Sequence, residues 1–154
     1  MIADVVLAES SHIAPIVANV READRLELWA MARATPDQCL RYGLQHSRTA
    51  YTGRIDGVPV CMFGATPYSL LGGIGVPWMV TATGLDRFSA QKALLRHSKP
   101  GVLELRRQFP ILVNAVHAGN AAAIRWLRWL GFTIHPVQPM GPDSDLFHPF
   151  TLES

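Results

Sequence analysis

The sequence predicts a three-layer α/β or α+β domain, in which helices flank a central sheet. Two observations predict this class. A run of strand-like segments in the first half of the chain gives way to a strand–helix–strand unit in the second half. The 154 residues also contain no internal repeat and no low-complexity linker. We therefore expect a single domain over residues 1–154.

The first helix contains a conflict in its sequence pattern. One of two consecutive serines caps it, and its buried stripe is formed by Ile13, Ile16, Val17 and Val20. Asp24 and Glu27 continue the same stripe, where carboxylates are seldom buried without a partner. We expect the helix to be interrupted between residues 20 and 29. The two carboxylates either pair with Arg21 or Arg25, which is the simpler account, or open into a cleft that receives an amine.

The rest of the chain before residue 110 is predicted to form four strands and three more helical segments. The expected strands are residues 4–8, 48–56, 58–66 and 78–82, and the expected helices are residues 36–47, 88–96 and 102–109. Thr35 and Gln38 form a capping box at the start of the first of these helices. Asp56-Gly57 is a strong hairpin signal between two strands. Pro100 predicts a kink or a break between the last two helices.

The strand–helix–strand unit has a helix with both ends marked. Asn120 is a good N-cap, three alanines follow it, and Gly131 stands where a left-handed C′ residue is wanted. The flanking strands are residues 111–116 and 132–135. Arg125 and Trp129 fall on the outward face of this helix, opposite Leu127. Because tryptophan and arginine are enriched at interface hot spots, we expect both to bind a partner. The alternative is that residues 136–150 fold across the helix and cover Trp129.

Composition excludes several classes of function. Hydrophobic residues make up 49% and charged residues 17%, and the net charge is +2. The two cysteines, Cys39 and Cys61, have no Cys-x-x-Cys spacing and are expected to be free thiols in a reducing compartment. Prolines and glycines interrupt the apolar residues 58–80, so no membrane helix is expected, and residues 1–10 are not expected to be a signal peptide. The six histidines show no metal-ligand spacing. We expect a soluble protein without a metal.

Several motifs together resemble the fold of the GNAT (Gcn5-related N-acetyltransferase) superfamily. Asn-x-x-Ala at residue 120, followed after seven further residues by Gly-Phe, is similar to the last motif of that fold. More narrowly, the chain resembles a family of phage internal virion proteins built on it. The features that carry this resemblance are Pro77-Trp78-Met79-Val80-Thr81, the strand ending at His117, Gly119-Asn120, Ile124-Arg125-Trp126-Leu127 and Leu146-Phe147-His148-Pro149-Phe150. It covers nearly the whole chain and implies a mixed, twisted central sheet flanked by helices.

The GNAT resemblance also implies a place for a cofactor. In that superfamily acetyl-CoA lies between two splayed parallel strands, and its pyrophosphate rests on N–H groups of a Gln/Arg-x-x-Gly-x-Gly/Ala loop at a helix start. The matching stretch here, residues 81–89, has one glycine and puts Asp86 where phosphates would lie. Leu127 replaces the tyrosine that protonates the leaving thiolate in many members. The candidate cofactor-binding residues are Val80, Thr81, Gly84 and Asn120. From these departures we expect weak acetyl-CoA binding or none.

His117 and Glu27 are the candidate catalytic residues, His117 because it lies at a strand end where a general base can sit. The alternative role for His117 is a hydrogen bond to the backbone. The glycines at positions 72, 73 and 75 precede a strand and lack a Gly-Lys-Ser/Thr ending, which favours a turn over a phosphate loop.

Three functions remain open at this point. The first is a non-catalytic phage virion or assembly protein, made in the host cytoplasm and located in the virion, that binds other virion proteins or itself. The second is an active acetyl-CoA-dependent N-acetyltransferase. The third is nucleic-acid binding, which has no base-reading motif and would use Arg87, Lys92, Arg96, Arg106 and Arg107.

Overall fold

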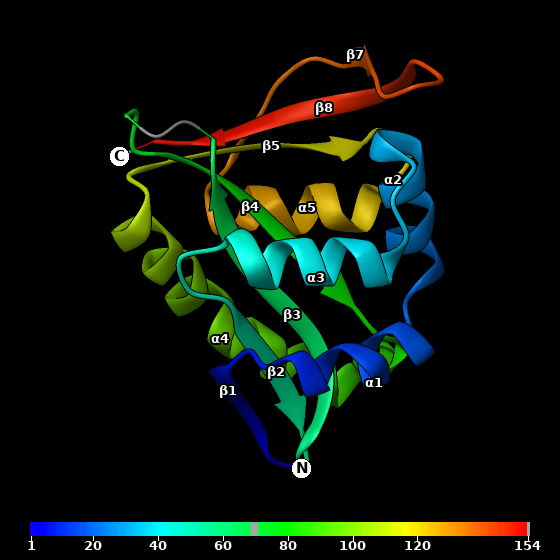
Figure 1. The fold of residues 1–154 in the computed structure, drawn as a ribbon, viewed down its shortest axis with the longest axis vertical. Helices are drawn as coiled ribbons and strands as arrows, with labels where there is room; N and C mark the ends of the chain where they lie inside the picture. The colour runs from blue at the N-terminus through cyan, green and yellow to red at the C-terminus, as the bar shows by residue number, and fades with distance from the viewer. Residues whose placement is uncertain (69–70, 154) are drawn as a thin grey trace.

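The computed structural model describes residues 1–68 and 71–153, and its centre is a mixed sheet in the order β1-β2-β3-β4-β5-β8-β6, with β7 paired to β8 (Figure 1). Neighbouring strands are antiparallel, except that β4 and β5 are parallel. The strands are β1 (Ala3–Leu7), β2 (Tyr51–Ile55), β3 (Val58–Pro67), β4 (Ile74–Thr81), β5 (Ile111–His117), β6 (Thr133–Ile134), β7 (Gln138–Met140) and β8 (Asp145–Leu152).

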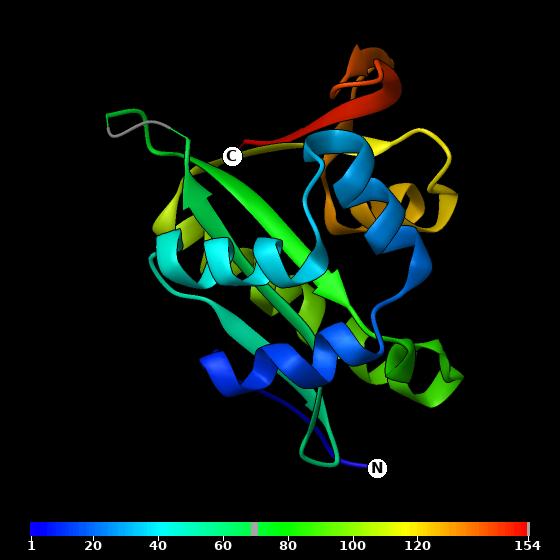
Figure 2. The same cartoon turned by 45° about the vertical axis from the view of Figure 1, so that its right-hand side comes forward.

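Helices cover both faces of this sheet, which confirms the predicted three-layer class (Figures 1 and 2). They are α1 (Ile13–Ala18), α2 (Glu22–Ala32), α3 (Pro36–His46), α4 (Phe88–Gln108) and α5 (Ala121–Leu130). One core joins α1 and α3 to β3 and β4 through Ile16, Leu40 and Met62. A second core lies under α4 and α5 and includes Leu105 and Leu127.

The local signals read from the sequence are present in the structure. The Thr35 hydroxyl accepts from Gln38 N–H, and the Gln38 side chain accepts from Thr35 N–H, which completes the capping box. The Asn120 side chain accepts from Ala123 N–H, and Gly131 has φ +101°. Asp56 and Gly57 both have positive φ, as the two-residue hairpin between β2 and β3 requires.

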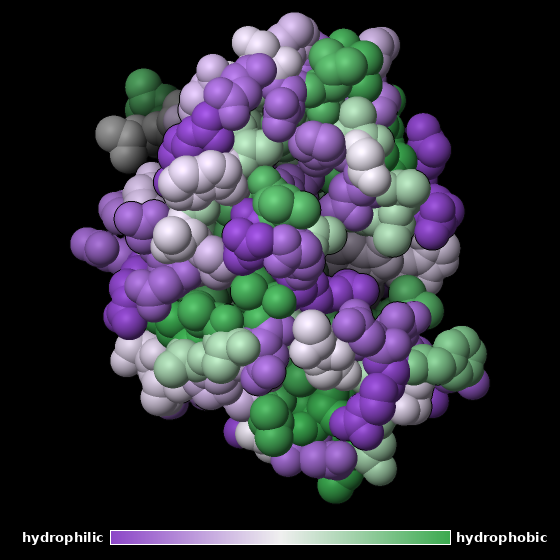
Figure 3. Space-filling view, turned by 90° about the vertical axis from the view of Figure 1, so that its right-hand side faces the viewer, coloured by the Kyte–Doolittle hydropathy of each residue, from purple (hydrophilic) through white to green (hydrophobic). Residues whose placement is uncertain are grey.

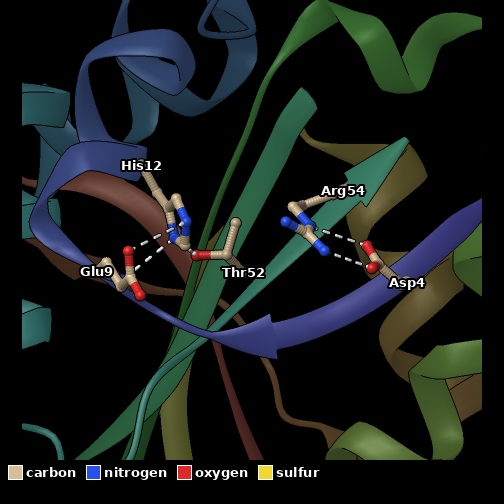
Figure 4. Close-up of polar contacts among 5 residues, drawn as sticks. All are labelled: Asp4, Glu9, His12, Thr52 and Arg54. Atoms are coloured by element: carbon tan, nitrogen blue, oxygen red, sulfur yellow. Dashed lines mark hydrogen bonds and ion pairs between the residues drawn. The ribbon is translucent and has the colours of Figure 1, made fainter. Parts of the chain in front are cut away.

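The first helix is interrupted, but the break lies at residues 19–21, at the start of the predicted interval, and residues 22–29 are helical. It ends at Ala18, Val20 pairs with Ala82 beyond the end of β4, and α2 begins at Glu22. Before α1, a 3₁₀ turn at Ser10–His12 is held to the sheet by the His12 ring, whose Nδ1 lies 2.8 Å from Thr52 Oγ1 (Figure 4). Thr52 is fully buried, so this contact fixes the start of α1 against β2.

The predicted break at Pro100 is wrong, because α4 runs without interruption from Phe88 to Gln108. A proline inside a helix loses one backbone hydrogen bond and costs about 3 kcal/mol. The helix is held against the sheet on both sides of Pro100, since Ala90, Ser98 and Leu105 are all buried. A Cβ at Gly101 would lie 3.4 Å from the Phe63 ring of β3, which is an ordinary contact.

Among the described residues, no helix has the length and apolarity needed to cross a membrane. Cys39 and Cys61 are free thiols, as expected.

Candidate active site between two separating strands

Strands β4 and β5 separate soon after they begin. Their parallel register consists of two residue pairs, of which Gly75 with Leu112 is the second. Alternate residues of β4 turn their backbone groups toward β5, and the next such residue is Pro77, which has no N–H to donate. The ladder cannot continue past it, and the strands diverge toward Thr81 and His117 (Figure 1).

A side-chain amide bridges the strands where they part. Asn114 Nδ2 of β5 donates to Pro77 O over 2.5 Å, and Ala115 N–H donates to Asn114 Oδ1 over 2.8 Å. The amide thus satisfies one backbone carbonyl of β4 and one N–H of β5 that the interrupted ladder leaves without strand partners. Asn114 and Pro77 together set where the opening begins.

Helix α2 lies across the open end and is bonded to both strands. Thr81, the last residue of β4, donates its N–H (2.7 Å) and its hydroxyl (2.5 Å) to Asp24 Oδ2. His117, the last residue of β5, donates its N–H to Glu27 Oε1, and Asn120 Nδ2 donates to Glu27 Oε2 over 3.4 Å. The i, i+3 spacing puts both carboxylates on one face of α2. In Figure 3, which looks onto this side, hydrophilic side chains run across the middle of the face.

The arginines do not pair with these carboxylates, contrary to the simpler expectation. Arg25 pairs with Glu22, and Arg21 Nε lies 3.0 Å from Asp86 Oδ1. Arg21 N–H donates to Thr81 O over 2.9 Å, which anchors the start of α2 to the end of β4. The two carboxylates therefore lie at the opening, because hydrogen bonds hold α2 to the ends of both strands.

Burial raises the pKa of Asp24, and the bonds from Thr81 oppose that shift. Burial also raises the pKa of Glu27, against the bonds from His117 N–H and Asn120, while the nearby charge of Asp24 adds to the increase. A carboxylate with a raised pKa is a better base at neutral pH. The cysteines are poor nucleophiles, because burial raises the pKa of Cys39 to about 11 and that of Cys61 to about 12.

The backbone of Met79 is open toward the gap between the strands. Pro77 O and Thr81 N–H both point away from β3, into the bonds with Asn114 and Asp24. Because backbone direction alternates along a strand, Met79, midway between them, turns its N–H and C=O the same way. No residue of the described chain is bonded to either group. Met79 therefore offers one donor and one acceptor inside the opening.

The four candidate cofactor-binding residues have different places. The side chain of Val80 is fully buried in the core with Ile16 and Leu40. Thr81 holds Asp24, and Asn120 caps α5 and donates to Glu27. A larger residue would not fit at Gly84 without a shift, because its Cβ would lie 2.9 Å from Val60 Cγ1. Thr81 and Asn120 thus lie at the opening, and Val80 and Gly84 serve packing.

The start of α4 follows a short 3₁₀ turn at Thr83–Asp86. Arg87 is the N-cap residue without a side-chain cap, and the first turn contains no acidic residue. Phe88 and Ser89 are exposed there. Because the first N–H groups of a helix have no partner within it, this end offers free donors. Asp86, which the sequence places near the phosphate position, is engaged by Arg21.

His117 contributes its backbone to the opening, and its ring is engaged elsewhere. The ring Nδ1 accepts from Gly119 N–H over 3.0 Å, Nε2 lies 3.8 Å from Asp145 Oδ2, and the ring packs edge-on against Phe147. The structure thus confirms the alternative role of His117, in which its ring forms a hydrogen bond with the backbone. Leu127 is buried in the core and offers no proton.

Trp129 and Arg125 lie on the outward face of α5, as predicted, and the Trp129 side chain is 46% exposed. Lys99 Nζ of α4 stands 4.5 Å from the centre of its ring. Across the described ranges, no three His, Cys, Asp or Glu residues are grouped so as to hold a metal ion.

Sequence reasoning missed Asn114, Pro77 and Met79. A signal for the first two existed, since a proline in a strand marks an interrupted ladder and an asparagine is out of place in an apolar strand run. Met79 had no such signal, because its contribution comes from backbone direction.

No protein-family model and no curated protein sequence matches the chain. Solved structures do. The ribosomal-protein-alanine N-acetyltransferase of Brucella melitensis has a TM-score of 0.73 at 15% identity, over 98% of this chain and 99% of that one. Salmonella typhimurium yncA, solved with its cofactor acetyl-CoA, has a TM-score of 0.71 at 17% identity, over 98% and 93%. A GCN5-related N-acetyltransferase of Kribbella flavida has a TM-score of 0.69 at 16% identity, over 99% and 98%. The chain therefore has the GNAT acetyltransferase fold.

Proposed function

We propose that this protein is an acetyl-CoA-dependent N-acyltransferase. The observation that carries the proposal is the opening between β4 and β5, where the free backbone edge of Met79 is accompanied by the carboxylates of Asp24 and Glu27 on α2. The fold similarity to acetyltransferases supports it. It replaces the non-catalytic virion protein, the first of our three sequence-based hypotheses.

The groups that would hold acetyl-CoA are present, although the loop sequence departs from the GNAT pattern. The N–H and C=O of Met79 suit an amide or carbonyl group, and the unpartnered N–H groups of Phe88 and Ser89 at the start of α4 suit phosphate. Arg87 and Lys92 add exposed positive charge beside them. Asp86 forms an ion pair with Arg21, which reduces the repulsion between its carboxylate and a phosphate bound here. Bound acetyl-CoA would supply the acetyl group: a C–N bond to the acceptor amine would form, the thioester C–S bond would break, and CoA would leave as its thiol with a proton lost by the amine.

The carboxylates of α2 suit the acceptor. An acceptor amine is an ammonium ion at neutral pH and must lose a proton before it attacks. Glu27 is a suitable base, because burial raises its pKa while His117 N–H and Asn120 hold it in place. Asp24 contributes a second negative charge that attracts an ammonium group. These two carboxylates indicate that the acceptor group is an amine.

Binding of acetyl-CoA is tested by isothermal titration at neutral pH. Met79→Pro removes the open N–H and leaves the β3 ladder intact, since that N–H faces away from β3. Loss of one hydrogen bond should weaken binding roughly five- to tenfold. Met79→Ala keeps the N–H and serves as the matched control. Failure of the unsubstituted protein to bind acetyl-CoA would restore our sequence-based expectation and refute the proposal.

Transfer is tested by thiol release from acetyl-CoA with a panel of primary amines and peptides. Glu27→Gln keeps an acceptor oxygen for His117 N–H but cannot take a proton, so we expect kcat to fall about 100-fold or more while acetyl-CoA affinity is kept. Equal rates for the two proteins would exclude Glu27 as the base.

The virion role implied by the phage resemblance has no support in the comparisons and stays a prediction. Mass spectrometry of purified phage particles tests it.

A further inference from the structure

Positive charge is concentrated on one layer of the molecule. Helices α4 and α5 together carry seven Lys and Arg residues and one acid, Glu104, a net charge of +6. The whole chain has a net charge of +2, so the remainder has a net charge of −4. The small net charge of the whole chain does not reveal this uneven distribution of charge.

The cations of each helix share one face. At about 100° per residue, Lys92, Arg96, Lys99, Arg106 and Arg107 fall within an arc of about 100° on α4. Arg125, Arg128 and Trp129 likewise fall within one arc on α5. The contact of Lys99 Nζ with the Trp129 ring, at 4.5 Å, joins the two arcs. We call these eight residues the basic face.

The cations of the basic face are almost free of ion pairs. Within the described residues, one of its seven cations, Arg107, pairs with a carboxylate, Glu104. Five of the seven cations elsewhere in the chain pair with carboxylates. Among the described residues, three buried donors on the same helices, Arg106 Nε, Gln108 Nε2 and Trp126 Nε1, have no hydrogen-bond acceptor, and one buried acceptor, Gln108 Oε1, has no donor. Beside Lys92 and Arg96 lies a cavity of about 270 Å³, also lined by Ser89 and His97. Most cations of the basic face are therefore without a carboxylate partner in the described chain.

We propose that the basic face binds the phosphate backbone of nucleic acid. The 21 residues of α4 extend for about 30 Å, and its cations are spread along most of that length, which suits a linear array of phosphates better than a single small anion. Lys92 and Arg106 lie about 20 Å apart along the helix, so the face exceeds what the start of α4 needs for a cofactor.

The other polyanionic partners fit less well. An interfacial membrane helix inserts a continuous apolar face, whereas the apolar side of α4 is buried through Ala90 and Leu105. Its exposed apolar residues, Phe88, Leu95 and Leu103, lie on separate turns among the cations. With no base-reading motif in the sequence, the binding is expected to be independent of base sequence.

Fluorescence anisotropy of the full chain with a labelled 24-base-pair duplex tests the proposal, with the salt concentration varied. Non-specific binding by five to seven phosphate contacts predicts a Kd of roughly 1–100 μM and a slope of log K against log salt of about −4.5 to −6. Lys92→Gln/Arg96→Gln and Arg125→Gln/Arg128→Gln should each make the slope shallower by about 2. Arg25→Gln/Arg41→Gln removes the same charge from the opposite layer, where both arginines are ion-paired, and should leave the slope unchanged.

Two results would overturn the proposal. One is equal loss of binding in the control and in the two basic-face variants, which would show a net-charge effect. The other is the absence of duplex binding at 50 mM salt together with binding to anionic vesicles or to polyglutamate, which would assign the face to a membrane or an acidic protein. Acetyl-CoA binding and transfer are measured separately, so either proposal can fail alone.

Discussion

Replacing Asn114 with alanine tests whether a side-chain amide holds β4 and β5 together where they part. The change removes the donor to Pro77 O, at 2.5 Å, and the acceptor for Ala115 N–H, at 2.8 Å. Each lost bond costs about 1 kcal/mol, so the free energy of unfolding should fall by about 2 kcal/mol. In a domain of this size that lowers Tm by about 4–8 °C.

Urea unfolding monitored by tryptophan fluorescence measures the loss. Asn114→Asp keeps the acceptor but not the donor and should lose at least about 1 kcal/mol. Asn19→Ala is the matched control, because Asn19 Nδ2 also donates to a proline carbonyl, Pro15 O, but over 3.4 Å on the exposed surface. Its effect should stay within about 0.5 kcal/mol. Equal losses for the two alanine variants would refute the bridging assignment.

Three further predictions follow from burial and helix geometry. Because burial raises the pKa of Asp24 and Glu27, the folded protein binds their protons more tightly than the unfolded chain does. Their contribution to stability is therefore greatest below about pH 4 and declines as pH rises through the raised values. Urea unfolding of Asp24→Asn/Glu27→Gln between pH 4 and 8 should show a smaller decline, and an unchanged pH profile would contradict this. Trp129→Ala should lower the free energy of unfolding by about 1 kcal/mol or less, since Trp129 is 46% exposed and its ring contacts Lys99 Nζ. A decrease of about 3 kcal/mol or more would show that Trp129 is a core residue. Pro100→Ala should raise the free energy of unfolding by at least about 1 kcal/mol, because it restores a helix hydrogen bond, and a lower Tm in calorimetry would show that the proline ring itself is needed.

The features predicted correctly from sequence are those whose cause lies within a few residues. Asn120 caps α5 through the N–H three residues ahead, and Gly131 ends it by adopting a positive φ. Asp56-Gly57 turns a hairpin by the same local logic. The interruption before α2 was also foreseen, because two carboxylates on an apolar stripe conflict with burial whatever the tertiary partner. Of the kink or break predicted at Pro100, the break is wrong, because α4 continues through the proline, and the kink stays a prediction.

The sequence by itself determined the three-layer class, the capped helices, the hairpin and the surplus of cations on two helices, since each depends on side-chain type and short spacing. The sequence also named Glu27, Thr81 and Asn120 as candidates, but tertiary structure alone decided which groups of the site meet. Glu27 meets His117 N–H across 90 residues, Asp24 meets Thr81 across 57, and Asn114 meets Pro77 across 37. No local pattern specifies such partners, because they depend on which strands lie side by side and on which way each backbone group points.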